Sequence, residues 1–200
     1  MVIWVGADKF VYWPYTQDPL TFTPARSSGL PVDSIRPGLM YTDGGSIPRP
    51  LRASESFSPW GYAPAYIVHD WLFAAHHCIV QGRPDAGDPR DRIEYDKVRA
   101  FSFDNSISAL AGVMRTLMQN GRVSSDPSAF NAISFGVETA IARRLWDDPD
   151  PRKCDPVSPK DKALIEDALK SKSLRGLTAF SVGGAGPKPP VVIYQQVYGR

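Results

Sequence analysis

The fold is decided by one stretch, Tyr62-Ala-Pro-Ala-Tyr-Ile-Val-His-Asp-Trp-Leu-Phe-Ala-Ala-His-His77, which holds all three histidines of the chain. Pro64 suits the first turn of a helix, where its missing N–H costs no hydrogen bond. Large side chains recur at steps of four and three, the spacing of one helical face, at Tyr62, Tyr66, His69, Phe73 and His76. The stretch therefore predicts a core helix from about residue 62 to residue 78.

His69 and Asp70 are neighbours in this helix, so their side chains diverge by about 100° around its axis. His69 shares the aromatic face and is expected to point inward, whereas Asp70 points to another side. His69 and His76 lie about 10 Å apart along the axis, too far to share one zinc ion. His76 and His77 are expected to meet the dipole at the C-terminal end of the helix.

The composition is that of one domain with an appended tail. A chain of 200 residues with 42% hydrophobic residues can bury a sizeable core. We predict a single domain over residues 1–148 and a Pro/Gly-rich extension over residues 149–200, with a short helix and a terminal strand. The net charge of +2 gives no sign of a nucleic-acid partner.

The first residues lack the basic start and apolar core of a signal peptide. No run approaches the roughly 18–20 apolar residues that span a bilayer. Cys78 and Cys154 have no metal-binding spacing, and although they could pair, we expect the reduced thiols of a cytoplasmic protein. The sequence predicts a soluble protein without a transmembrane segment.

Residues 1–60 are rich in proline, glycine and aromatic residues and show no helical period. Strand-like pieces at Val2–Val5, Phe10–Trp13 and Leu20–Thr23 are separated by turn signals. The region ends in a loop, Tyr41-Thr-Asp-Gly-Gly-Ser-Ile-Pro-Arg-Pro-Leu51, in which Asp-Gly-Gly permits positive φ. We predict a small irregular β region, and the loop is also open to a simpler interpretation as a hairpin turn.

Further helices are predicted after the central one. A helix from Asp88 to about Gln119 would begin with a cap and Pro89, and its apolar stripe is Ile93, Ala100, Phe103, Ile107, Leu110, Met114 and Leu117. A third helix over residues 125–146 would face inward with Phe130, Ile133, Val137, Ile141 and Leu145. A short helix over 159–170, a linker over 171–190 and a strand over 191–198 complete an α+β fold, in which the β region packs on a mainly antiparallel core of three helices.

Asp96 occupies a polar position on a stripe that otherwise faces a core. A buried carboxylate is costly unless it is paired, and a short connection would place the two helices antiparallel, with His69 facing Asp96. A hydrogen bond between them would fix the imidazole tautomer and let the free ring nitrogen deprotonate water. His69 and Asp96 are therefore the candidate catalytic pair. The alternative is that Asp96 anchors a tyrosine or an arginine in the core.

Asp70 and the glycine-rich loop form a candidate metal site. Calcium takes carboxylate and backbone carbonyl oxygens, and a glycine-rich loop can turn its carbonyls towards such an ion. The candidate ligands are Asp70, Asp43, Gly44 and Gly45, with calcium as the candidate cofactor. The alternative for Asp70 is a surface carboxylate or a cap of the preceding loop.

Three short blocks follow one another as Thr42-Asp-Gly-Gly-Ser-Ile-Pro-Arg49, Ala65-Tyr-Ile-Val-His-Asp-Trp-Leu-Phe73 and Tyr95-Asp-Lys-Val-Arg-Ala-Phe101. Together they resemble a phage and prophage family catalogued as domain of unknown function 1353, over about residues 8–147. Gly45, Phe73 and Tyr95 stand where that family usually has Ala, Tyr and Ala. The resemblance implies a phage or prophage protein, located in the bacterial cytoplasm of the host or in the virion, but it implies no activity.

The set His69, Asp70 and Asp96 also resembles phospholipase A2 enzymes, which place a His-Asp pair on one helix and a lone Asp on its antiparallel partner. By this resemblance His69 activates water, Asp96 orients His69, and Asp70 holds calcium together with the loop from Asp43 to Gly45. The calcium would polarise an ester carbonyl. Phe73 departs from the tyrosine common at that position, and the disulfides of the secreted enzymes are missing.

Two functional hypotheses follow. The first is a calcium-dependent hydrolase of lipid esters, with membrane lipid as its partner. The second is a non-enzymatic structural or assembly protein of a phage tail, virion or lysis module, which would contact other phage proteins through its C-terminal strand. A metal-dependent phosphohydrolase of the His-Asp type is set aside, because the chain has no histidine before His69.

Overall fold

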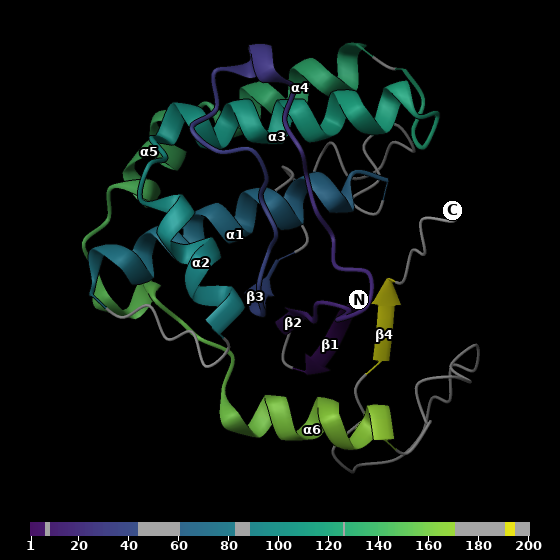
Figure 1. The fold of residues 1–200 in the computed structure, drawn as a ribbon, viewed down its shortest axis with the longest axis vertical. Coiled ribbons are helices and arrows are strands. Elements are labelled where there is room, and N and C mark those ends of the chain that lie inside the picture. Colours follow the sequence, from purple (N-terminus) through teal and green to yellow (C-terminus); the bar gives the residue numbers. More distant parts are fainter. Residues whose placement is uncertain (7–8, 44–60, 83–88, 126, 171–190, 195–200) are drawn as a thin grey trace.

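The computed structural model describes residues 1–6, 9–43, 61–82, 89–125, 127–170 and 191–194. In these residues a four-stranded antiparallel sheet packs with helices that cover both of its faces (Figure 1). The α-helices are α1 (Ala63–Val80), α2 (Pro89–Val98), α3 (Phe103–Gln119), α4 (Pro127–Val137), α5 (Ala140–Trp146) and α6 (Pro159–Lys170). The predicted α+β class is confirmed, and none of the helices described is long and apolar enough to cross a membrane.

The sheet has the strand order β3-β2-β1-β4. Its strands are β1 (Val2–Gly6), β2 (Lys9–Tyr12), β3 (Met40–Thr42) and β4 (Val191–Tyr194). The first two predicted strands are confirmed by β1 and β2. The third predicted strand, Leu20–Thr23, forms only an isolated bridge between Phe22 and Ile35, and β3 reaches into the stretch that we predicted to be a loop.

Alternate residues of β1 and β2 pack against different layers, because successive side chains of a strand point to opposite faces. Val2 and Tyr12 belong to the main core with α1, whereas Ile3 and Val11 form a second cluster with Ile165 of α6. The sheet therefore lies between α1 and α6, with α3 stacked on the far side of α1 (Figure 1). The predicted short helix over residues 159–170 is confirmed by α6.

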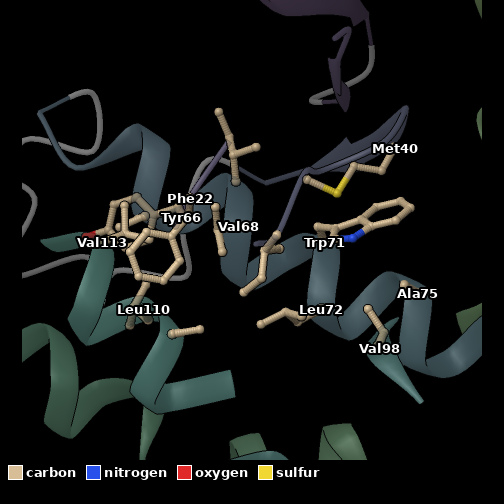
Figure 2. Packing of buried hydrophobic residues seen from close by; sticks show 14 of the residues in the cluster. Phe22, Met40, Tyr66, Val68, Trp71, Leu72, Ala75, Val98, Leu110 and Val113 are labelled. Carbon is tan, nitrogen blue, oxygen red and sulfur yellow. The ribbon is translucent and has the colours of Figure 1, made fainter. Parts of the chain in front are cut away.

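The central element is α1, which contacts α2, α3, α5 and β3. Pro64 lies in its first turn, as predicted, and most of its residues through Cys78 are buried. A helix that is apolar on nearly all sides is stable only inside a core. Figure 2 shows Trp71 of this helix beside Met40 of β3, and Tyr66 close to Phe22 and Val113. Polar side chains of α1 are therefore placed in a largely apolar setting.

The predicted single helix over residues 88–119 is wrong, because the chain breaks it into α2 and α3. Ser102 caps α3 by accepting a hydrogen bond from the backbone of Asn105, and the Asn105 side chain accepts one from the backbone of Ser102. This capping box resets the helical phase. The predicted apolar stripe holds within α3 but fails in α2, where the side chain of Ile93 is 60% exposed.

The predicted helix over residues 125–146 is divided in the same way. Thr139 caps α5 by accepting a hydrogen bond from the backbone of Ala142, after α4 has ended at Val137. The predicted inward positions Ile141 and Leu145 are 69% and 44% exposed, whereas Trp146 is buried. The predicted inner face is confirmed in α4, where Ile133 is buried and Phe130 and Val137 pack on the core, and it is wrong only in α5, after the break.

Cys78 of α1 and Cys154 form a disulfide, so the predicted reduced thiols are wrong. The two residues are 76 positions apart in sequence, and their Cα atoms lie 4.5 Å apart because the 3-10 turn Pro151–Lys153 packs on α1. The bond ties the beginning of the predicted C-terminal extension to the central helix. The division of the chain near residue 148 stays a prediction.

Candidate active site

Four polar side chains gather where β3 passes the middle of α1, and we call Thr42, Asp43, His69 and Asp70 the α1–β3 cluster. Thr42 Oγ1 donates a 2.5 Å hydrogen bond to Asp70 Oδ2. The charge of Asp43 acts on both His69 and Asp70. Asp70 therefore faces the residues that lead into the glycine-rich loop. Gly44 and Gly45 lie outside the described residues, so their assignment as ligands stays a prediction.

Asp70 is a carboxyl group held in an unfavourable setting for its charge. Burial, and after it the nearby charge of Asp43, raise the pKa of Asp70 to about 8, although the hydrogen bond from Thr42 lowers it. At neutral pH most molecules therefore keep a proton on this carboxyl group. A cation held by Asp43 and Asp70 would relieve their repulsion and replace that proton.

His69 is a neutral imidazole in the same cluster. Burial lowers the pKa of His69 to about 4, although the charge of Asp43 raises it. Its Nε2 atom is shielded from solvent and has no hydrogen-bond partner in the part of the chain that the structure describes. The ring packs on Phe73, with 4.8 Å between the ring centroids. A buried polar atom without a partner is costly, so a water or substrate atom that bonds Nε2 would be stabilised.

Tyr66 contributes a second buried polar atom on the Asp70 side of α1. Its hydroxyl oxygen has no hydrogen-bond partner among the described residues, and the residue is only 3% exposed. Burial raises the pKa of Tyr66, and Tyr62 and Asp70 raise it further, so the hydroxyl keeps its proton. From the sequence we considered Tyr66 only as a core residue that Asp96 could anchor, although its position four residues before Asp70 on one helical face was a usable signal.

Asp96 does not orient His69, so the predicted catalytic pair is wrong. The Asp96 side chain is 62% exposed and forms a 3.1 Å ion pair with Arg99 on the surface of α2. The prediction extended the stripe of α3 backwards through the helix break, which put Asp96 on the wrong side of α2. Asp96 therefore has no part in the α1–β3 cluster.

The buried carboxylate of α2 is Glu94, which sequence analysis missed. Glu94 is 5% exposed, and it accepts hydrogen bonds from Lys97 Nζ at 2.8 Å and from the backbone N–H of Arg36 at 3.0 Å. Lys97 also donates to Ser34. Glu94 thus anchors the segment around residues 34–36 to α2, which is the structural role that we considered for Asp96.

His76 and His77 lie near the C-terminal end of α1, as predicted, but side-chain contacts hold them there. The ring of His76 stacks on Trp146, with centroids 4.0 Å apart and planes 16° apart. His77 is buried and hydrogen-bonds the backbone of Leu145 and Asp148. These two histidines dock the end of α5 onto α1 and lie outside the α1–β3 cluster.

The donor set of the cluster suits a hard cation better than zinc. Within the described ranges, no group of three or more His, Cys, Asp or Glu side chains could hold a metal ion. Asp43 and Asp70 supply carboxylate oxygens, which calcium prefers, and calcium commonly completes its shell with backbone carbonyls and water. The side chains described here are thus compatible with calcium as long as other oxygen donors complete its shell.

Comparisons with known proteins add no relative to this picture. No family model matches the chain, and neither a curated protein nor a solved structure matches it. The resemblances to the phage family and to phospholipase A2 therefore stay predictions. The functional argument depends on the residues of the chain itself.

Proposed function

We propose that the chain is a calcium-dependent hydrolase whose active site is the α1–β3 cluster. The observation that carries the proposal is a pair of carboxyl groups, Asp43 and Asp70, beside an imidazole with an unbonded Nε2 atom among the described residues. Such a combination offers oxygen ligands for a cation and a base for water at one place.

Asp43 and Asp70 would hold the ion, and the carbonyls of Gly44 and Gly45 are the further predicted ligands. When bound, calcium would polarise a carbonyl oxygen of the substrate and stabilise the charge that develops on it. The raised pKa of Asp70 supports this role, because a bound cation would favour its ionised form.

His69 would act as the general base. Its lowered pKa leaves the ring unprotonated at neutral pH, so that Nε2 can accept a proton from an attacking water. The charge of Asp43 stabilises the imidazolium that would form. In this site the imidazole ring of His69 is positioned by packing against Phe73 and not by a carboxylate partner.

The proposed substrate is a lipid ester, and the proposed partner is the membrane lipid of a bacterial host. Both come from the resemblance to phospholipase A2 and to the phage family. Of the two predicted locations, the virion lies outside the reducing cytoplasm, so the disulfide between Cys78 and Cys154 favours the virion.

The test is hydrolysis of a fluorogenic phospholipid by the wild-type chain, measured with calcium and with a chelator. We expect activity only with calcium, and we expect His69→Ala to lower it by at least about a hundredfold, as for loss of a general base. Asp70→Asn should remove the calcium dependence together with the activity.

Asp96→Ala is the matched control, because Asp96 is an exposed carboxylate outside the cluster. The Asp96→Ala variant should keep wild-type activity. If Asp96 oriented His69, the variant would instead lose activity. Equal rates for wild type and His69→Ala, or no calcium-dependent rate for the wild type, would overturn the proposal.

A non-enzymatic structural or assembly protein is the second candidate, and one observation favours it. β4 pairs with β1 at the edge of the sheet, with Ile3 opposite Val192. An edge that accepts an extended strand in this way can also accept one from another chain. Val192→Pro would weaken this pairing, and a change of oligomeric mass in light scattering would support an assembly role, whereas an unchanged mass would speak against it.

A further inference from the structure

A concave region lies between the segment 12–22, the beginning of α1 and the C-terminal half of α3. It is a pocket of about 650 Å³. Ligand sites in proteins usually measure about 300–1,000 Å³. None of the residues that line it belongs to the α1–β3 cluster. The pocket therefore needs an explanation of its own.

The polarity of the pocket changes from its interior to its mouth. Its buried wall is formed by Val2, Tyr12, Phe22, Ile67, Val113 and Leu117. Its exposed lining is polar and comprises Tyr15, Asp18, Thr21, Thr116, Asn120 and Arg122. A ligand that fits this gradient has an apolar part that enters the pocket and a polar part that stays at the surface.

The mouth carries no net side-chain charge. Asp18 and Arg122 are the charged side chains that line the pocket, and their charges are opposite. The amino group of Met1 also lines it, but burial lowers its pKa to about 6 and its hydrogen bond goes to the carbonyl of Trp13. The hydroxyl of Thr116 and the amide of Asn120 lie one helical turn apart on the α3 side. Such a rim offers hydrogen bonds to hydroxyl groups but does not favour a head group with net charge of either sign.

We propose that this pocket binds a single-chain alkyl amphiphile with an uncharged, hydroxyl-bearing head. The alkyl chain lies against Phe22, Ile67 and Val113, and the head bonds the polar groups of the rim. The pocket is separate from the α1–β3 cluster, so this proposal does not depend on the hydrolase function proposed above.

Phe22 approaches Gly112 so closely that a side chain at position 112 would displace this wall of the pocket. A Cβ atom on Gly112 would lie 2.8 Å from Cζ of Phe22, so that the ring would have to shift. Phe22 itself lines the pocket. Gly112→Ala should therefore change the shape of the pocket, while alanine suits the interior of a helix better than glycine does.

The test is calorimetric titration of the full chain with decyl glyceryl ether below its micelle concentration. The ether carries no ester bond, so binding is measured independently of hydrolysis. We expect saturable binding, and octyl glyceryl ether should bind about fifteenfold more weakly, because each buried methylene contributes about fourfold. Decanoate and decyltrimethylammonium should both bind at least about tenfold more weakly than the uncharged ether.

Two variants locate the site. Thr116→Trp at the mouth and Gly112→Ala behind Phe22 should each weaken binding by at least about tenfold. Gln119→Trp is the control for Thr116→Trp, because it is also exposed on α3 but does not line the pocket. Circular dichroism melting shows whether each variant is folded.

The proposal is overturned if the uncharged ether shows no saturable binding. It is also overturned if folded Thr116→Trp and Gly112→Ala bind as tightly as Gln119→Trp. Tighter binding of decanoate or of the cationic amphiphile would refute the uncharged head group.

Discussion

The central helix α1 carries two histidine regions that differ in how completely their polar atoms are bonded. Near its C-terminal end, His76 stacks on Trp146, His77 bonds backbone groups, and Cys78 forms a disulfide. Near its middle, Nε2 of His69 and the hydroxyl of Tyr66 have no hydrogen-bond partner among the residues that the structure describes.

The difference separates a region whose polar groups hold the chain together from the region of the proposed active site. Buried polar groups in proteins are nearly always satisfied, and each exception needs a reason. The contacts of His76 and His77 explain their burial by docking α5. The burial of His69 and Asp70 is unfavourable in the unliganded protein, and a bound cation and substrate would relieve it.

The largest expected change in stability comes from a substitution near the C-terminal end of α1, where the polar side chains are hydrogen-bonded or stacked. Trp146→Ala should lower the free energy of unfolding by about 4 kcal/mol, because it removes a buried indole that contacts His76 and Phe73. Denaturation in urea measures it. Ile141→Ala in the same helix is the control, and it should change stability by less than about 0.5 kcal/mol because Ile141 is 69% exposed.

Removal of the disulfide should have the next largest effect. Cys78→Ala combined with Cys154→Ala should lower the free energy of unfolding by about 3 kcal/mol, because the bond closes a long loop in the unfolded chain. Reductant added to the wild type should reproduce the loss in the same urea titration. A double variant as stable as the oxidised wild type would contradict the role assigned to this end of α1.

Near the middle of α1, where polar atoms lack hydrogen-bond partners among the described residues, a substitution should raise the stability of the protein and not lower it. Asp70→Asn should raise the free energy of unfolding by about 2 kcal/mol at pH 8 without calcium, because it removes a buried carboxyl group whose ionisation is opposed. The folded pKa of about 8 lies above the unfolded value of 3.8, so the carboxyl group lowers stability as pH rises between them.

Calcium should stabilise the wild type in thermal melts and leave Asp70→Asn unchanged. If Asp70→Asn were less stable than the wild type, the carboxyl group of Asp70 would stabilise the fold, as the contacts of His76 and His77 do. The comparison between the two regions of α1 would then lose its basis.

The smallest expected effect is the acid sensitivity of His69. Its folded pKa of about 4 lies below the unfolded value of 6.5, so the unfolded chain binds more protons between these values. Stability is complete above pH 6.5 and should fall by about 1 kcal/mol towards pH 4, less than a full conversion of the shift because the ring is partly exposed.

His69→Leu should remove most of this decline in urea titrations at a series of pH values. His76→Phe should remove less of it. Burial also lowers the pKa of His76, but a hydrogen bond to the backbone of Trp146 opposes that shift, whereas Nε2 of His69 has no hydrogen-bond partner among the described residues. A larger effect from His76→Phe would assign the acid sensitivity to the other region.

Local patterns predicted those elements whose signals are complete within a few residues. Pro64 and the apolar run that follows it placed α1, and residues 159–170 were predicted with the bounds of α6. Alternation of apolar residues placed β1 and β2. In each of these elements, local preference and tertiary packing favour the same structure.

The error at Asp96 has a local cause that was present in the sequence. Ser102 and Asn105 are three residues apart and form a capping box, which ends one helical phase and begins another. Thr139 does the same before α5. A stripe extended through such a cap assigns inner and outer faces incorrectly, as it did for Asp96 and for Ile141.

Other features depend on contacts that no local pattern contains. The disulfide requires that the turn at residues 151–153 pack on α1. The burial of Glu94 requires the segment around Arg36 to contact α2, where the backbone N–H of Arg36 donates to Glu94. The proximity of Thr42 to Asp70 was expected only through the glycine-rich loop, whereas the structure brings them together through β3.

The link between Cys78 and Cys154 also makes a closed covalent ring of the backbone that carries α2, α3, α4 and α5. A protease that cuts once inside this ring cannot release a fragment, because both sides of the cut stay joined through the sulfur atoms. The nicked chain would migrate as one species until a reductant divides it in two.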